Sequence, residues 1–305
     1  MHQPRFQFGL DAVRALFNAL FREALPADEP ELLRLLAGVG WHFEAGFSPG
    51  RTRWMVEEVS RTFGLSGRAA DAAAREAWDL WMQARLEELM LPRWVNAAQS
   101  SGEWVRFEGS LPERGLVLHL RAGSRMMAAW GLAERGCAAG HPVGWVGVFG
   151  RRGLPPEGRG SVRRSWLNQR DARRRRREEN SLPIAWLEDE RALEAHLSAG
   201  GVAIVAVDDQ GFEDREPGVL FGQQVSMGVL PWRLRDEFPS CWMGVERLRD
   251  KTHRVELHDA TGLDDAALLT VLEQDVRRRP GHYAMTLVEH RMRGDWRKHR
   301  QPKVF

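Results

Sequence analysis

The stretch Gly-Val-Ala-Ile-Val-Ala-Val at residues 201–207 decides the fold class of this chain. It is short, continuous and rich in β-branched residues, which is typical of a strand buried on both faces of a sheet. Residues 189–198, directly before it, have the spacing of an amphipathic helix. A helix that leads into a buried strand predicts an α/β fold.

Further strands and helices alternate on both sides of this stretch. A second apolar run, Gly-Leu-Val-Leu-His-Leu at residues 115–120, predicts another buried central strand. Residues 124–136 and 263–279 have helical patterns, and the second pattern ends at Pro-Gly. We therefore expect a mixed sheet flanked by helices over residues 101–305, with further strands at 104–109, 143–149, 241–248 and 253–258.

The first third of the chain has only helical patterns. Residues 8–25 place phenylalanine and leucine on one face and arginine on the other, which fits either packing on the core or contact with a membrane surface. The strongest helical pattern, at residues 67–91, is predicted to end at Pro92. We expect a helical N-terminal region over residues 1–100, with further helices at 31–41 and 52–63, joined to the α/β part in one compact domain.

The composition does not single out a metal, nucleic-acid or membrane-spanning protein. The formal net charge is +2, and no apolar run approaches the ~18 residues of a transmembrane helix. Cys137 and Cys241 are isolated, so neither a zinc site nor a disulfide framework is expected, and a reducing, cytoplasmic compartment fits. No metal ligand set and no bound cofactor are expected.

An arginine-rich segment lies at residues 150–181. It begins with glycines and prolines and contains five consecutive arginines at 173–177. Such a run can grip phosphates of anionic lipid, of a substrate or of nucleic acid. The alternative is a solvated helix face, because Glu178 and Glu179 follow at once. Aromatic residues do not interleave with the arginines, so a nucleic-acid platform is not favoured.

Several ordered segments carry a resemblance to a known family. They are a helix at residues 64–91, the strand Trp-Val-Arg-Phe-Glu-Gly at 104–109, Gly-Leu-Val-Leu at 115–118, Ala-His-Leu-Ser-Ala-Gly-Gly at 195–201, Val-Asp-Asp-Gln at 207–210, Phe221-Gly222 with Ser226 and Gly228, Pro-Gly-His-Tyr at 280–283, and His290-Arg291. In order and spacing, over roughly residues 30–293, they resemble the lauroyl/myristoyl acyltransferases of bacterial lipid A biosynthesis.

This resemblance implies a glycerolipid acyltransferase-like core. Such enzymes transfer a fatty acyl group from acyl-carrier protein or coenzyme A to a hydroxyl on a lipid. A histidine takes the hydroxyl proton, and an acidic residue four positions further on orients that histidine. The family carries this motif directly after the strand that corresponds to residues 115–118.

The sequence departs from the family pattern at this motif. When Gly123 is aligned with the motif glycine, Arg121 falls at the catalytic histidine and Met126 at the acid. Arginine, with a pKa above ~12, cannot act as a general base at neutral pH. The remaining catalytic candidates are His119, oriented by Asp209 if their strands are adjacent, and Ser124 as an acyl-accepting nucleophile, although no nucleophile elbow surrounds it.

Each candidate has a structural alternative. His119 lies within an apolar run and can be a buried structural histidine, while Asp209 can belong to a turn that ends its strand. Arg121 and Arg125 are expected to bind phosphates of the donor or acceptor. The resemblance also implies substrate-binding roles for three further residues, Gln210, Phe221 and Gly222.

Three functions stay open. The first is acyl transfer from acyl-carrier protein or coenzyme A thioester to a hydroxyl or amine acceptor, at the cytoplasmic face of the inner membrane. The second is a non-catalytic family member that binds an acyl chain, a carrier protein or an enzyme partner, supported by the missing histidine and acid. The third, nucleic-acid binding, depends on the arginines at 173–177 alone.

Overall fold

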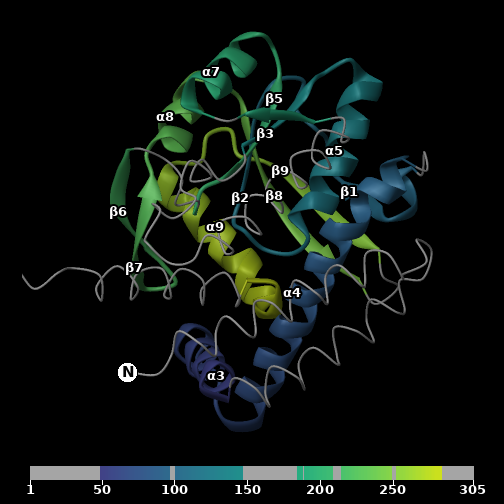
Figure 1. The fold of residues 1–305 in the computed structure, drawn as a ribbon. Helices are drawn as coiled ribbons and strands as arrows, with labels where there is room; N and C mark the ends of the chain where they lie inside the picture. The colour runs from purple at the N-terminus through teal and green to yellow at the C-terminus, as the bar shows by residue number, and fades with distance from the viewer. Residues whose placement is uncertain are drawn as a thin grey trace, which may run out of the picture.

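The computed structural model describes residues 49–96, 100–146, 184–187, 189–208, 214–248 and 252–283. The expected helices at 8–25 and 31–41 and the arginine-rich segment lie outside these residues. The described part consists of a helical pair, α3 and α4, and a sheet with helices on both faces (Figure 1). The α/β class and the mixed sheet expected from the sequence are confirmed.

The sheet has seven strands in the order β1-β9-β8-β2-β5-β3-β4. Strands β8, β2, β5, β3 and β4 run parallel, whereas β9 pairs antiparallel with β8, and β1 pairs parallel with β9. The strand bounds are Val105–Glu108 for β1, Gly115–His119 for β2, Val143–Val146 for β3, Ala185–Leu187 for β4, Val202–Ala206 for β5, Ser240–Arg247 for β8 and His253–Asp259 for β9.

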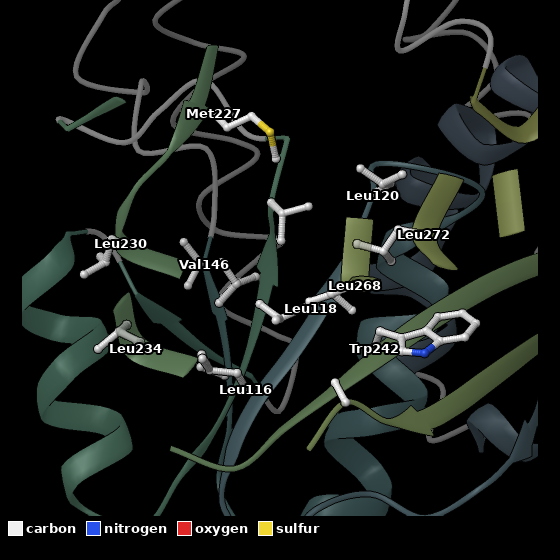
Figure 2. Close-up of a cluster of buried hydrophobic side chains, with 14 of the residues drawn as sticks. Leu116, Leu118, Leu120, Val146, Met227, Leu230, Leu234, Trp242, Leu268 and Leu272 are labelled. Atoms are coloured by element: carbon white, nitrogen blue, oxygen red, sulfur yellow. The ribbon is translucent and has the colours of Figure 1, made fainter. Parts of the chain in front are cut away.

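Helices cover both faces of this sheet. On one face lie α4 (Gly67–Asn96) and α5 (Arg125–Ala139), which pack with Val117 and Ile204. On the other face lie α7 (Glu190–Ser198), α8 (Leu230–Glu237) and α9 (Asp265–Arg278), which pack with Leu116 and Leu118. Figure 2 shows these two leucines among side chains of α8 and α9. Because neighbouring residues of a strand point to opposite faces, both faces of β2 and β5 are apolar, with His119 at the end of β2 as the exception.

Helix α4 is longer than expected from the sequence. It was predicted to end at Pro92, but it continues to Asn96. Trp94, in this extra turn, is buried and stacks on Trp104 with ring centroids 4.6 Å apart. A proline inside a helix removes one backbone hydrogen bond, and burial of a large aromatic side chain offsets that loss.

Four elements between β3 and β8, namely β4, β6, β7 and α8, were not expected from the sequence. Strand β4 forms one edge of the sheet, and α8 follows a two-stranded hairpin of β6 (Arg215–Leu220) and β7 (Gln223–Gly228). Strand β4 has only three residues, and β6 contains a proline and a glycine, so neither gives the sustained pattern from which strands are recognised.

The N-terminal helical pair matches its expected position. Helix α3 spans Pro49–Phe63 and packs on α4 through Met55, Val59, Ala74, Ala77 and Trp78. The far end of α4 joins the core of the sheet through Met90, Leu91 and Trp94. None of the helices in the part of the chain that the structure describes combines the length and apolarity needed to cross a membrane.

Candidate functional site

The neighbouring strands β2 and β5 define a candidate site at their carboxyl ends. They pair in parallel, from Gly115 opposite Val202 to His119 opposite Ala206. After β2 the chain passes through α5 on one face and returns at β3, whereas after β5 it passes through α8 on the other face and returns at β8. Open α/β sheets bind ligands at the carboxyl ends of two neighbouring strands whose following segments leave to opposite faces. Residues 120–124, after β2, and residues 207–208, after β5, lie at this point.

A glycine turn shapes the loop after β2. Gly123 has a φ of +63°, and a Cβ at this position would lie 2.9 Å from the carbonyl oxygen of Val245 in β8. Its backbone N–H donates to the carbonyl oxygen of His282 at 3.1 Å. The loop is therefore held against β8 and against the chain segment at residues 280–283.

A buried ion pair links the two strand ends. The Arg121 backbone N–H donates to Asp208 Oδ1 at 3.1 Å, and its Nε donates to Oδ2 at 3.3 Å. Tyr283 Oη also donates to Oδ2, at 2.9 Å. Burial and then the negative charge of Asp208 raise the pKa of Tyr283 well above its ordinary value, so its hydroxyl stays protonated as a donor. All three side chains are buried.

The turn of the β6–β7 hairpin covers Tyr283. Phe221 has a φ of +55°, which is uncommon for a residue with a side chain, and its N–H donates to the Glu273 carboxylate at 2.8 Å. The Phe221 ring lies 5.4 Å from the Tyr283 ring, and the next residue, Gly222, is exposed. Phe221, expected to bind substrate, thus contacts the buried ion pair through Tyr283.

His119 lies apart from this cluster. Its side chain is only 1% exposed, Nδ1 is 2.8 Å from the Leu120 carbonyl oxygen, and its ring packs near Trp145 on the α5 face. Burial, the largest cause, lowers the pKa of His119 to about 4, with Arg125 and Arg121 lowering it further and the Leu120 carbonyl and Asp208 opposing them. A histidine with so low a pKa is neutral at pH 7 but a weak general base.

Ser124 and Arg125 begin helix α5. Ser124 is the N-cap residue, but its side chain makes no capping hydrogen bond. Its hydroxyl is buried and has no hydrogen-bond partner within the described ranges. Arg125 is half-buried, and Met126, which the resemblance aligned with an acidic residue, packs against the core under α5.

Two of the expected site residues cannot be placed. Asp209 and Gln210 lie outside the described residues, so the expected pair of His119 with Asp209 stays a prediction. The residues that sequence reasoning did not choose are Asp208 and Tyr283. Both carried a signal, because Asp208 directly follows the strongest apolar run and Tyr283 is the only tyrosine of the chain.

Other polar clusters of the described residues serve the fold. Glu87 of α4 forms an ion pair with Arg247 and a hydrogen bond with His253, and both contacts tie α4 to β8 and β9. A cleft of about 620 Å³ lies where β8 begins and α9 begins, but its buried Arg235 is bound to Asp265 and to the Leu263 carbonyl oxygen. Within the described ranges, no group of three or more metal-ligating side chains occurs.

Comparison with known proteins adds no assignment. The chain matches no protein-family model and no curated protein sequence. The class that the described structure defines is an α/β protein with a candidate ligand site at the carboxyl ends of β2 and β5.

Proposed function

We propose that this protein binds a fatty acyl thioester, carried by acyl-carrier protein or coenzyme A, on a glycerolipid acyltransferase-like fold without transferring the acyl group. One observation carries the proposal. Arg121, at the position that the family resemblance gives to the catalytic histidine, is buried and ion-paired with Asp208. The group at the expected reaction centre is thus a cation that cannot accept a proton and whose charge is already compensated.

The state of His119 supports the same proposal. Within the part of the chain that is described, its ring nitrogen faces a backbone carbonyl, and burial lowers its pKa to about 4. An effective general base needs a pKa near the working pH, and a neighbouring carboxylate ordinarily provides it. In the described residues the nearby carboxylate, Asp208, is engaged by Arg121 and Tyr283 instead.

Acyl transfer to a hydroxyl or amine acceptor remains a second candidate because of Ser124. Its buried hydroxyl has no hydrogen-bond partner in the described structure, and it lies at the N-terminus of α5. Backbone N–H groups at a helix N-terminus can stabilise the oxyanion that forms when a thioester carbonyl is attacked.

The proposed location is the cytoplasm, with peripheral contact at the cytoplasmic face of the inner membrane. Both cysteines are free thiols, which is compatible with a reducing compartment. Membrane contact depends on the amphipathic pattern at residues 8–25, outside the described residues. A nucleic-acid partner is not part of the proposal.

Binding and turnover of an acyl thioester separate the two candidates. The experiment titrates the protein with palmitoyl-coenzyme A and with acylated carrier protein by calorimetry, and then follows thioester loss by mass spectrometry with a hydroxyl or amine acceptor present. We expect saturable binding of one donor and thioester loss no faster than in buffer. The variant His119→Asn, which keeps an amide near the position of Nδ1, should bind the donor as the parent protein does.

Two results would contradict the proposal. Absence of binding to both donors would exclude the acyl thioester as ligand. Turnover that disappears in His119→Asn or in Ser124→Ala would make the protein an acyltransferase and identify the residue that acts.

A further inference from the structure

The first turn of α5 lacks the groups that normally compensate the positive end of a helix. The N-cap Ser124 does not accept a hydrogen bond from the turn, and the turn contains no acidic residue. Its first residue is Arg125, whose positive charge repels the positive end of the helix dipole. Helix N-termini with free N–H groups are ready sites for anions.

A second observation is the Ser124 hydroxyl. The side chain is 3% exposed, and within the described residues its oxygen has no hydrogen-bond partner. Buried hydroxyls are ordinarily hydrogen-bonded, so an unpartnered one calls for an explanation. Ser124 is the residue that directly precedes the first turn of α5, so this unpartnered hydroxyl belongs to the N-terminus of the helix.

The surrounding charge also favours an anion. Among the charged groups that act on His119, Arg125 has the largest effect and lowers the pKa, whereas Asp208 raises it and Arg121 lowers it, so positive potential from Arg125 reaches this end of β2. Arg125 is the first residue of α5, and Arg121 is ion-paired with Asp208. The turn lies at the carboxyl end of β2, next to β5, where ligands of α/β sheets bind.

We infer that the first turn of α5, with the Ser124 hydroxyl and the Arg125 guanidinium, binds a phosphate group of the ligand. Three kinds of donor meet here, namely backbone N–H groups, a hydroxyl and a guanidinium, and a tetrahedral phosphate offers several acceptor oxygens to match them. This inference builds on the proposed function, because coenzyme A and the phosphopantetheine arm of acyl-carrier protein both carry phosphate.

The test compares ligands that differ in phosphate. Calorimetric titrations at constant ionic strength use coenzyme A, inorganic phosphate and pantetheine, which lacks the phosphate. We expect coenzyme A to bind about tenfold or more tightly than pantetheine, as one charge-assisted anion contact would give. A further arm compares vesicles of phosphatidic acid with vesicles of phosphatidylcholine and reveals whether a lipid phosphate binds at the same turn.

Two variants change the site, and one matched variant controls for charge. Arg125→Gln removes the cation, and Ser124→Asp places a carboxylate at the N-cap, where it fills the anion position. Both should lower the affinity for coenzyme A and phosphate by about tenfold, with pantetheine unaffected. Arg135→Gln removes the same charge from an exposed position in the C-terminal half of α5 and should change none of the affinities.

Ser124→Asp provides a readout that a purely structural role would not give. A carboxylate at the N-cap should raise the thermal midpoint of the free protein while it removes the stabilisation by phosphate. Should Ser124→Asp fail to fold, Ser124→Ala removes only the unpartnered hydroxyl and should still lower the affinity for phosphate.

The outcomes distinguish this site from the proposed function. Equal affinities for coenzyme A and pantetheine, or losses shared by Arg135→Gln, would overturn the phosphate site even if palmitoyl-coenzyme A binds. Phosphate binding that depends on Ser124 and Arg125, without tighter binding of palmitoyl-coenzyme A than of coenzyme A, would confirm the phosphate site and exclude the acyl thioester as ligand.

Discussion

At the residue scale, Asp208 is the centre of the buried polar cluster. Its two carboxylate oxygens accept hydrogen bonds from the Arg121 backbone, the Arg121 side chain and the Tyr283 hydroxyl. Taking a carboxylate and a guanidinium out of water costs several kcal/mol per ion, and these bonds offset that cost only while all partners are present. The cluster joins the end of β2, the end of β5 and the segment that follows α9.

Removal of the carboxylate should therefore be costly. We expect Asp208→Ala to lower the free energy of unfolding by about 3–5 kcal/mol, because the Arg121 charge is left buried without its partner. Tyr283→Phe, which removes one donor to a charged acceptor, should cost about 1.5–3 kcal/mol. Urea unfolding followed by circular dichroism measures both.

The control for Asp208 is an exposed aspartate. Asp236→Ala, on the surface of α8, should change the free energy of unfolding by less than about 0.5 kcal/mol. If Asp208→Ala costs no more than this control, the ion pair does not hold the strand ends together.

At the scale of elements, α4 connects two parts of the molecule. Its first half packs against α3 through Ala74, Ala77 and Trp78, and its last turns pack on the sheet through Leu91 and Trp94. The ion pair of Glu87 with Arg247 and its hydrogen bond with His253 lie between these two contacts. The position of α3 relative to the sheet therefore depends on how firmly the end of α4 is anchored.

Truncation of Trp94 tests this anchor. We expect Trp94→Ala to lower the free energy of unfolding by about 3–5 kcal/mol, because it opens a cavity and removes the stacking on Trp104. Arg75→Ala, on the exposed side of the same helix, should stay within about 0.5 kcal/mol of the parent protein. Equal effects of the two variants in urea unfolding would mean that the turn beyond Pro92 contributes nothing to the fold.

At the scale of the whole molecule, three histidines with lowered pKa values, His119, His253 and His282, make stability depend on pH. Burial is the largest cause that lowers the pKa of His119 to about 4, of His253 to about 3 and of His282 to about 4. Arg247 lowers the pKa of His253 further, and Arg279 does so for His282. In the unfolded chain each histidine returns to a pKa near 6.5.

We expect the free energy of unfolding to fall as the pH is lowered below about 6.5. Between the folded and unfolded pKa values the unfolded chain binds more protons, so acid favours unfolding, and above pH 6.5 this contribution to stability is fully present. Between its folded and unfolded pKa values, each histidine changes the free energy of unfolding by up to about 1.4 kcal/mol per pH unit. Urea unfolding between about pH 7.5 and about pH 5, where most carboxylates stay ionised, measures the slope.

A single substitution checks the origin of this slope. His119→Asn removes one of the three titrating rings. Between about pH 6.5 and pH 5 it should lower the slope of the unfolding free energy against pH by an amount equivalent to up to one bound proton. A flat profile in the parent protein, or a slope unchanged by His119→Asn, would contradict the buried, neutral state of this ring.

The two central strands of the sheet could be predicted from the sequence, whereas the edge strand β4 and the separate β6–β7 hairpin could not. Residues 115–119 and 202–206 are buried on both faces and are apolar except for His119, and that local pattern is visible in the sequence. Strand β4 and the β6–β7 hairpin have no such pattern, because they are short or interrupted by proline and glycine. The prediction that α4 ends at Pro92 was wrong. The helix continues because Trp94 is buried in the tertiary structure, which a local sequence pattern does not show.

The sequence by itself determined the α/β class and the two central strands, and it placed Arg121 and Met126 where the resemblance would require a histidine and an acid. Only the tertiary structure decided that Asp208 accepts from both Arg121 and Tyr283, and that His119 faces the α5 side of the sheet. The physical reason is distance along the chain. Hydrophobic periodicity is local and can be read residue by residue, but a buried charge finds its partner across the fold, where only the packing of strands and helices sets the geometry.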